Sequence, residues 1–149
     1  MSNLIALSNV NKKFKIDFWL FGRTLLHGYK GKIFSNDLID EVGAWESSIK
    51  GNKKLTDQLK LEGFSIIKSR AFDIWLFRKS RLLIVKLFSS KNNFCYVDDY
   101  KLKENHFLFL DKFMWSDYSF SIPSEPNLLI QKMYTPDRKE KINRLFRVL

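Results

Sequence analysis

Cysteine, glycine and proline are scarce in this sequence, and their scarcity excludes several kinds of protein. Cys95 is the only cysteine among 149 residues, so the chain forms no internal disulfide and no zinc site of several thiolates. Six glycines and three prolines are too few for a low-complexity linker. Because Cys95 lies in the apolar run NNFCYV, we expect it to be a small buried hydrophobic residue.

Acidic residues are outnumbered by basic ones. Twenty-six lysines and arginines stand against 16 aspartates and glutamates, which gives a net charge of +10. Such an excess favours polyanionic partners, namely nucleic acid, anionic lipid headgroups, or phosphate-bearing nucleotides and glycans. It is equally typical of a solvated basic surface that only keeps a protein soluble. We therefore expect weak polyanion binding that fades at physiological salt.

Long hydrophobic runs are also missing. The most apolar stretch, IDFWLFGRTLL, is interrupted by Asp17 and Arg23 and is far shorter than the roughly 18 residues of a membrane-spanning helix. The first residues, MSNLIALSNVNKKFK, lack the basic start, apolar centre and small-residue cleavage site of a secretory signal. We expect a cytoplasmic protein without a membrane span, and peripheral contact with a membrane surface stays open.

Bulky apolar residues, by contrast, are abundant. Hydrophobic residues make up 45% of the chain and aromatic residues 15%, which is enough to build a folded core. The length suits one domain that covers residues 1–149. Apolar residues recur at helical spacing near both ends of the chain and at every second position in its middle. This pattern predicts an α+β fold, with a mixed or antiparallel sheet flanked by helices.

The same patterns divide the chain into elements. Ile16–Phe21 is predicted to be an aromatic strand that ends at Gly22, and a short helix follows over residues 23–30. A second strand carries the acids of NDLIDEVGAW, and residues 47–62 are predicted to form a helix. Further strands are expected in FSIIKS, FDIWLFRKS, LLIVKLFSS, FCYVDD (where Asp98 and Asp99 end the strand in solvent), HFLFLDKFMW and YSFSIP, and further helices near Leu4–Val10, from Ser124 to Tyr134 and from Asp137 onward.

Two segments resemble one protein family. The first, FWLFGRTLLHGYKGKIFSNDLIDEVGAW (Phe18–Trp45), is similar to the aromatic strand, Gly-(Gly/Arg)-Thr-Leu-Leu turn and acidic strand of the LicD/fukutin group. The second, FSIPSEPNLLIQKMYTPDR (Phe120–Arg138), is similar to the group's C-terminal Ile-Pro-Ser, Leu, Tyr, Pro pattern. The resemblance implies a nucleotidyltransferase-like fold. It also implies transfer of a phosphorylated group, such as phosphocholine or a polyol phosphate, from a nucleotide-activated donor to a glycan or surface polymer.

The resemblance implies a phosphate site where the first strand turns into a helix. Gly22 would let the backbone approach a phosphate closely, and Thr24 would add a hydroxyl donor. Arg23 and Lys30 would add positive charge beside the N–H groups of the helix N-terminus, which themselves favour anions. In the purely structural alternative, Gly22 only permits a sharp turn and Thr24 only caps a helix.

The resemblance further implies a catalytic Mg²⁺ site on the acidic strand. The candidates are Asp37, Asp40 and Glu41, with Asp37 and Asp40 as metal ligands, because paired carboxylates hold a divalent ion that aligns phosphate and acceptor. One register places Asp37, Ile39 and Glu41 at the family's three acidic positions, and the other places Asn36, Leu38 and Asp40 there. Neither register puts adjacent carboxylates on one strand face, since Asp37 and Glu41 would stand about 13 Å apart. A β-bulge in this strand would be needed to pair them.

Lys86 falls where the family has its third carboxylate. An ammonium group repels a metal ion, but it can take the ion's place and neutralise a phosphate. Three functions therefore remain open. The first is a Mg²⁺-dependent transferase, and the second is a pseudoenzyme without a cofactor that binds nucleotide or glycan phosphate or completes a partner protein. The third is a basic nucleic-acid-binding protein, which the interleaved aromatic and basic residues of KNNFCYVDDYKLK favour.

Overall fold

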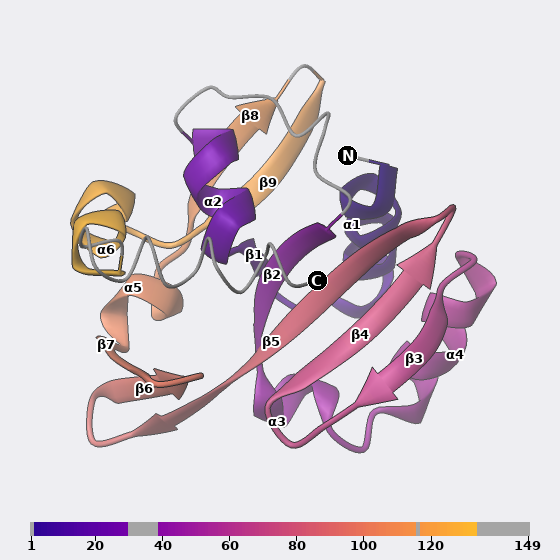
Figure 1. The fold of residues 1–149 in the computed structure, drawn as a ribbon, viewed down its shortest axis with the longest axis horizontal. Coiled ribbons are helices and arrows are strands. Elements are labelled where there is room, and N and C mark those ends of the chain that lie inside the picture. Colours follow the sequence, from indigo (N-terminus) through magenta and orange to yellow (C-terminus); the bar gives the residue numbers. More distant parts are fainter. Residues whose placement is uncertain (1, 30–38, 116, 134–149) are drawn as a thin grey trace.

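The computed structural model describes residues 2–29, 39–115 and 117–133, and these build a mixed sheet flanked by helices (Figure 1). The strand order is β3-β4-β5-β2-β1-β9-β8, and β6 and β7 extend from the end of β5. The strands are β1 (Phe18–Leu20), β2 (Ile39–Trp45), β3 (Ser65–Ser69), β4 (Asp73–Arg78), β5 (Arg81–Lys91), β6 (Phe94–Val97), β7 (Tyr100–Lys103), β8 (Asp111–Trp115) and β9 (Tyr118–Ile122). This arrangement confirms the predicted α+β class.

Strand direction in the sheet is mixed. β2 pairs in parallel with β5 along its whole length, and β1 pairs in parallel with β9, whereas the other neighbours are antiparallel. Because parallel neighbours cannot be joined by a tight turn, the chain between β2 and β5 must make a long crossover. That crossover contains α3 (Glu46–Ile49), α4 (Lys53–Leu61) and the β3–β4 hairpin. β2 is thereby fixed in the middle of the sheet, between β1 and β5.

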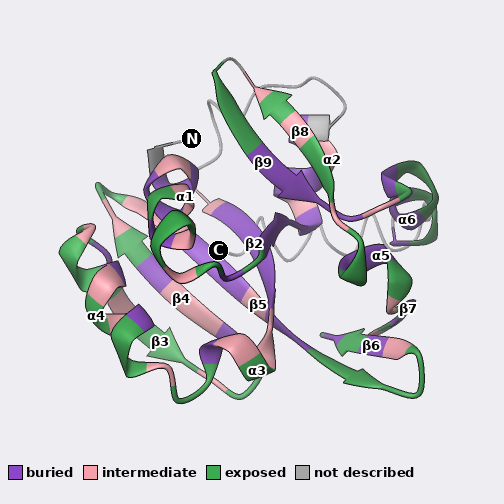
Figure 2. Ribbon diagram, turned by 180° about the vertical axis from the view of Figure 1, so that it is seen from behind, coloured by how far each residue is buried: buried purple, intermediate pink, exposed green. Residues whose placement is uncertain are grey.

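The helices lie on different sides of the sheet. α1 (Ser2–Phe14) and α4 lie behind the β3–β4–β5 part in Figure 1 and in front of it in Figure 2, which views the molecule from the other side. α2 (Gly22–Tyr29), α5 (Asn105–Leu108) and α6 (Pro126–Met133) gather instead around the β1, β8 and β9 end. None of the helices in the described ranges lies over the front of β3 and β4.

An aromatic cluster packs β1 and α5 against β5. Trp19 of β1, Phe21, Phe88 of β5 and Phe107 of α5 are each no more than 2% exposed. Their ring centroids lie 4.7 Å apart for Phe88 and Phe107, 4.9 Å for Phe21 and Phe88, and 5.0 Å for Trp19 and Phe88. Burial of such large rings contributes strongly to folding, so this cluster holds the β1–Gly22–α2 turn rigidly against β5.

Cys95 lies on β6 and is fully buried. Burial raises the pKa of its thiol to about 12, because the thiolate would lose its hydration inside the protein. The expectation of a small buried hydrophobic residue is therefore confirmed.

Two predicted elements differ from the observed ones. The single helix expected over residues 47–62 is broken into α3 and α4 at Gly51, which has a positive φ of 74°. The strand expected in HFLFLDKFMW is wrong in its first half, where α5 forms instead. There His106 Nδ1 lies 2.7 Å from the Ser124 carbonyl oxygen, and Phe107 enters the aromatic cluster. Tertiary contacts thus override the strand preference of these residues. The predicted helix from Asp137 lies outside the described residues.

No helix within the described ranges is both long and apolar enough to cross a membrane.

Candidate functional site

The turn from β1 into α2 is the first part of the candidate site. Gly22 has a φ of +55°, a left-handed conformation that glycine adopts without steric cost. A side chain at this position would also collide with Glu41, because an added Cβ would overlap the Glu41 carboxylate. Gly22 therefore does more than permit the turn, since its missing side chain leaves the space that the Glu41 carboxylate fills.

Glu41 of β2 is tied to this turn by three hydrogen bonds. The backbone N–H of Arg23 donates to Glu41 Oε2 at 3.1 Å, so the carboxylate lies at the N-terminus of α2. The backbone N–H of Glu41 donates to Thr24 Oγ1 at 2.7 Å, and the N–H of Phe21 donates to the Glu41 carbonyl oxygen at 3.2 Å. The structure thus brings Gly22, Arg23, Thr24 and Glu41 together, as the sequence predicted for a helix N-terminus that faces an acidic strand.

The carboxylate of Glu41 is held at an energetic cost. The side chain is 8% exposed, and burial raises the pKa of its carboxyl group above the ordinary value. The positive charge of Lys86 and the N–H of Arg23 act in the opposite direction but do not cancel the effect of burial. Glu41 consequently takes up a proton more readily than an ordinary glutamate does.

Asp40 points away from this site. Neighbouring residues of a strand alternate between the two faces of the sheet, so Asp40 shares the face of Val42, beneath α1. Asp40 is 2% exposed. The structure therefore does not bring Asp40 and Glu41 together, and the sequence-based assignment of Asp40 as a metal ligand beside α2 finds no support in this geometry. Asp37 and Lys30 lie outside the described residues.

Lys86 belongs to a group of charges on the same face as Glu41, which we call the Lys86 cluster: Lys86, Asp98, Asp73 and Arg70. Lys86 lies opposite Gly43 of β2, two residues along from Glu41. Its Nζ is 3.1 Å from Asp98 Oδ1 and 3.9 Å from Asp73 Oδ2. Its nearest partners are therefore Asp98 and Asp73, and the role of Lys86 in place of a third carboxylate stays a prediction.

Asp73 is the most tightly held carboxylate in the cluster. Arg70 donates two hydrogen bonds to it, from Nε and Nη2, both at 2.6 Å, and Trp75 Nε1 donates a third at 3.1 Å. Burial acts to raise the pKa of Asp73, but these hydrogen bonds and the charges of Arg70 and Lys86 outweigh it and lower the pKa. Asp73 therefore stays ionised in the folded protein.

Sequence reasoning missed Asp73 and Arg70, and it placed Asp98 in solvent. The close spacing of Arg70 and Asp73 in SRAFD was a local sign of an ion pair. The contact between Asp98 and Lys86 had no such sign, because it depends on how β6 folds back beside β5. Asp98 is one-third exposed and sits in a turn with a φ of +51°.

The described residues do not fit a divalent metal ion by themselves. Within residues 2–29, 39–115 and 117–133 no group of three acidic, histidine or cysteine side chains converges in a way that could hold one. Glu41 contributes one carboxylate, its neighbour Ile39 on the same face offers no ligand atom, and Lys86 adds positive charge nearby. A divalent metal ion needs several oxygen ligands, and the positive charge of a nearby ammonium group opposes its binding.

Comparison with known proteins identifies the fold. The chain matches no protein-family model and no curated protein sequence. Its structure is similar to the lincosamide antibiotic adenylyltransferase LnuA in its lincomycin-bound form, with a TM-score of 0.63, 12% identity, and coverage of 99% of this chain and 97% of that one. It is also similar to the antibiotic-resistance factor ANT(2'')-Ia, with a TM-score of 0.61, 9% identity, and coverage of 98% and 90%. A second structure of that protein, in complex with adenylyl-2''-tobramycin, gives a TM-score of 0.62 at 6% identity, with coverage of 95% and 83%. The fold is therefore that of the nucleotidyltransferases.

Proposed function

We propose that this chain is a nucleotidyltransferase-fold protein that binds phosphate-bearing nucleotides without a metal ion and does not transfer a group by itself. The observation that carries the proposal is the arrangement around α2. One carboxylate, Glu41, lies at the helix N-terminus, and the ammonium group of Lys86 lies on the neighbouring strand. A transferase of this fold would need several carboxylates and a metal there to offset the charge gathered between donor and acceptor.

The proposed phosphate site uses groups that need no metal. The N–H groups at Gly22, Arg23 and Thr24 begin α2 and favour an anion, and Lys86 supplies a positive charge on the same sheet face. Lys30 is the further cation that the sequence predicts for this site. Glu41 competes with a phosphate when it is ionised. When it is protonated, its carboxyl group can donate a hydrogen bond to a phosphate oxygen, so binding should strengthen as the pH falls.

An active transferase is the second candidate, because Glu41 faces the α2 N-terminus as one carboxylate of a metal-binding pair would. In that case Asp37 and Glu41 would hold Mg²⁺, whose charge would offset the negative charge gathered between donor and acceptor. The finer form of this candidate is the LicD/fukutin-like transfer of phosphocholine or a polyol phosphate to a glycan or surface polymer. The acceptor, the single domain over residues 1–149 and the cytoplasmic location remain predictions.

The experiment that decides between the two candidates measures nucleotide binding by calorimetry and product formation in parallel. Nucleoside di- and triphosphates and CDP-linked donors are titrated into the protein with Mg²⁺, with Mn²⁺ and with EDTA, and product formation is followed in parallel. We expect weak binding that is equal in all three conditions, and no turnover. Lys86→Met should weaken binding, whereas Lys50→Met, which removes a surface lysine paired only with Glu46, should not. Tight binding abolished by EDTA, or turnover lost in Asp37→Ala, would establish the transferase instead.

A further inference from the structure

More than half of the net charge of this protein comes from the β3–β4–β5 segment. Between residues 65 and 91 the basic residues are Lys68, Arg70, Arg78, Lys79, Arg81, Lys86 and Lys91, and the only acidic residue is Asp73. Asp73 is fully buried and neutralised by Arg70, so it adds little negative potential at the surface. This part of the molecule therefore presents a positive surface that attracts polyanions.

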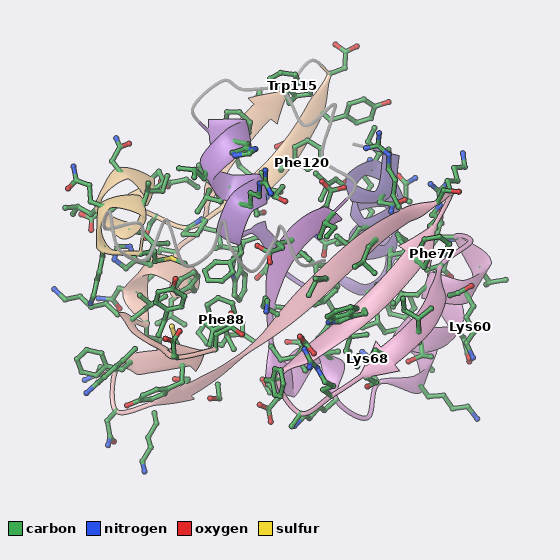
Figure 3. All side chains as sticks on the ribbon, viewed as in Figure 1. Lys60, Lys68, Phe77, Phe88, Trp115 and Phe120 are labelled. Atoms are coloured by element: carbon green, nitrogen blue, oxygen red, sulfur yellow. The ribbon has the colours of Figure 1, made fainter. Side chains whose placement is uncertain are left out.

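The uncovered side of this segment also exposes aromatic side chains. Trp75 and Phe77 alternate along β4 on the face of Lys86, and over β3 and β4 none of the described helices covers this face. Phe77 is 42% exposed, and Phe72, just before β4, is 46% exposed. Figure 3 labels Lys68 and Phe77, which lie over the β3–β4 side of the molecule, well away from Phe88 and the aromatic cluster. Exposed rings of this size usually mark a binding surface.

Cations and rings alternate in space on this side of the sheet. Lys68 Nζ lies 4.8 Å from the centre of the Trp75 ring. The guanidinium carbon of Arg70 lies 4.3 Å from the centre of the Phe72 ring and 5.5 Å from that of Trp75. Because Arg70 is also held by two hydrogen bonds to Asp73, its planar group is fixed in place instead of moving freely in solvent. A fixed guanidinium beside exposed rings offers planar surfaces on which bases stack, and Lys68 beside Trp75 adds a positive charge for the phosphate between them.

We propose that this surface, made of Lys68, Arg70, Phe72, Trp75 and Phe77 and here called the β3–β4 face, binds single-stranded nucleic acid. Stacking on aromatic rings together with cations that follow the phosphate backbone is the common chemistry of sequence-tolerant single-strand binding. The face shares no residue with the proposed phosphate site at the α2 N-terminus, although Arg70 and Lys86 both contact Asp73.

An acidic peptide fits this face less well than a nucleic acid does. A peptide that added a strand would have to pair with β3, which is the edge of the sheet. The β3 ladder is irregular between Ile66 and Lys68, and its edge carries an exposed lysine. Bulges and lysines at a sheet edge oppose the pairing of a further strand. The exposed rings, in contrast, suit flat bases, which a peptide lacks.

The test uses the full chain and a fluorescein-labelled oligouridylate of about 12 nucleotides, a length within the usual range for single-strand sites. Fluorescence anisotropy gives the affinity over a series of salt concentrations, and a duplex of the same length is measured alongside. We expect the single strand to bind more tightly than the duplex at each salt concentration, because stacking needs unpaired bases. Duplex binding at least as tight as single-strand binding would overturn the proposal, since charge alone would then account for the affinity.

Matched substitutions locate the site. Phe77→Ala should weaken binding at least about 5-fold, because one base loses its stacking partner. Lys68→Ala removes one contact to a phosphate, so the plot of log affinity against log salt concentration should become less steep by about 1. Tyr118→Ala and Lys60→Ala are the controls, because Tyr118 is also 42% exposed but lies on β9, and Lys60 is an exposed lysine of α4, on the other side of the sheet. Equal losses in the controls would overturn the proposal.

Two further measurements check that the variant is folded and that the face prefers nucleic acid to an acidic protein. Phe77 is largely at the surface, so the circular dichroism spectrum of Phe77→Ala should match that of the unaltered protein. If that variant were misfolded, the comparison of Lys68→Ala with Lys60→Ala would test the proposal by itself. Polyglutamate is added as a competitor at equal charge, and we expect it to displace the oligouridylate much less effectively than unlabelled oligouridylate does. Equally effective displacement would assign the face to an acidic protein partner and overturn the proposal.

Discussion

Asp73 and Glu41 are carboxylates buried on the same face of the sheet, and burial acts to raise the pKa of both, yet their pKa values are shifted in opposite directions. Asp73 accepts hydrogen bonds from Arg70 and Trp75, and its pKa is lowered. Glu41 accepts one from the backbone N–H of Arg23, and its pKa is raised. The degree of burial alone thus does not determine whether a buried carboxyl group is ionised. The number and charge of its hydrogen-bond donors also matter.

The contrast also separates a structural acid from a candidate functional one. Asp73 is fully compensated and joins β4 to β5 through Lys86. Glu41 is placed at a helix N-terminus, with its ionised form destabilised by burial. Perturbed carboxyl groups of this kind are common at functional sites, because a group that is easily protonated can exchange hydrogen bonds with a ligand. The following variants test whether the two acids differ as the geometry indicates.

The largest effect is expected for Asp73→Ala. Removal of this carboxylate takes away three hydrogen bonds, two of them from Arg70, and hydrogen bonds to charged groups contribute about 1.5–3 kcal/mol each. Arg70 is partly exposed and Lys86 keeps Asp98, so neither cation is left as an uncompensated buried charge, and we expect a total loss of about 3 kcal/mol. Urea unfolding measures the change, with Glu46→Ala as the control, because Glu46 pairs with Lys50 at the surface and should cost less than about 1 kcal/mol. Similar losses in both variants would contradict a special role for Asp73.

A smaller loss is expected for Gly22→Ala. The left-handed conformation of residue 22 disfavours any side chain, and the added methyl group must displace the Glu41 carboxylate, for a combined cost of about 2 kcal/mol. In the Glu41→Ala background the clash with the carboxylate is removed, so the same change should cost only about 1 kcal/mol. A double-mutant cycle measured by urea unfolding gives the coupling. Purely additive changes would show that Gly22 and Glu41 do not share this space.

The smallest effect is expected for Glu41→Gln, and its sign is opposite. The folded protein holds a proton on Glu41 where the unfolded chain has lost it, so stability falls as the pH rises from about 4.3, the ordinary glutamate pKa, through the raised pKa of Glu41. Glutamine stays neutral, so at pH 7 the variant should be more stable by about 1 kcal/mol or less.

Unfolding at a series of pH values checks this prediction for Glu41. The difference between Glu41→Gln and the unaltered protein should shrink toward acid pH, where Glu41 is itself neutral. Asp73, whose pKa is lowered, has the reverse dependence, because its stabilising charge is lost as the pH falls. A variant less stable than the unaltered protein at pH 7 would show that the charge of Glu41 is well compensated.

The sequence predicted the strand, glycine, helix and strand around Gly22 correctly, because each has a strong local pattern. It left the register of the acidic strand open, since alternation shows that Asp40 and Glu41 face opposite sides but not which side faces α2. The hydrogen bond from the Arg23 N–H to Glu41 Oε2 shows that Glu41 faces α2, and it joins residues that are far apart in sequence. The partners of Lys86 were missed for the same reason, because strand pairing brings Asp98 and Asp73 to it.

β5 is shared between two sets of strands, and this affects the order in which the molecule can be assembled. Its earlier residues pair with β2 and β4, and Ser89, Ser90 and Lys91 pair with β6. The β3–β4–β5 meander consists of neighbouring segments and can form early, whereas β2 pairs with β5 only after the intervening crossover has closed. On a ribosome, Glu41 would therefore emerge well before the strand that carries Lys86. The environment of Glu41 is completed late, by contacts of high contact order, while the β3–β4 face needs only local ones.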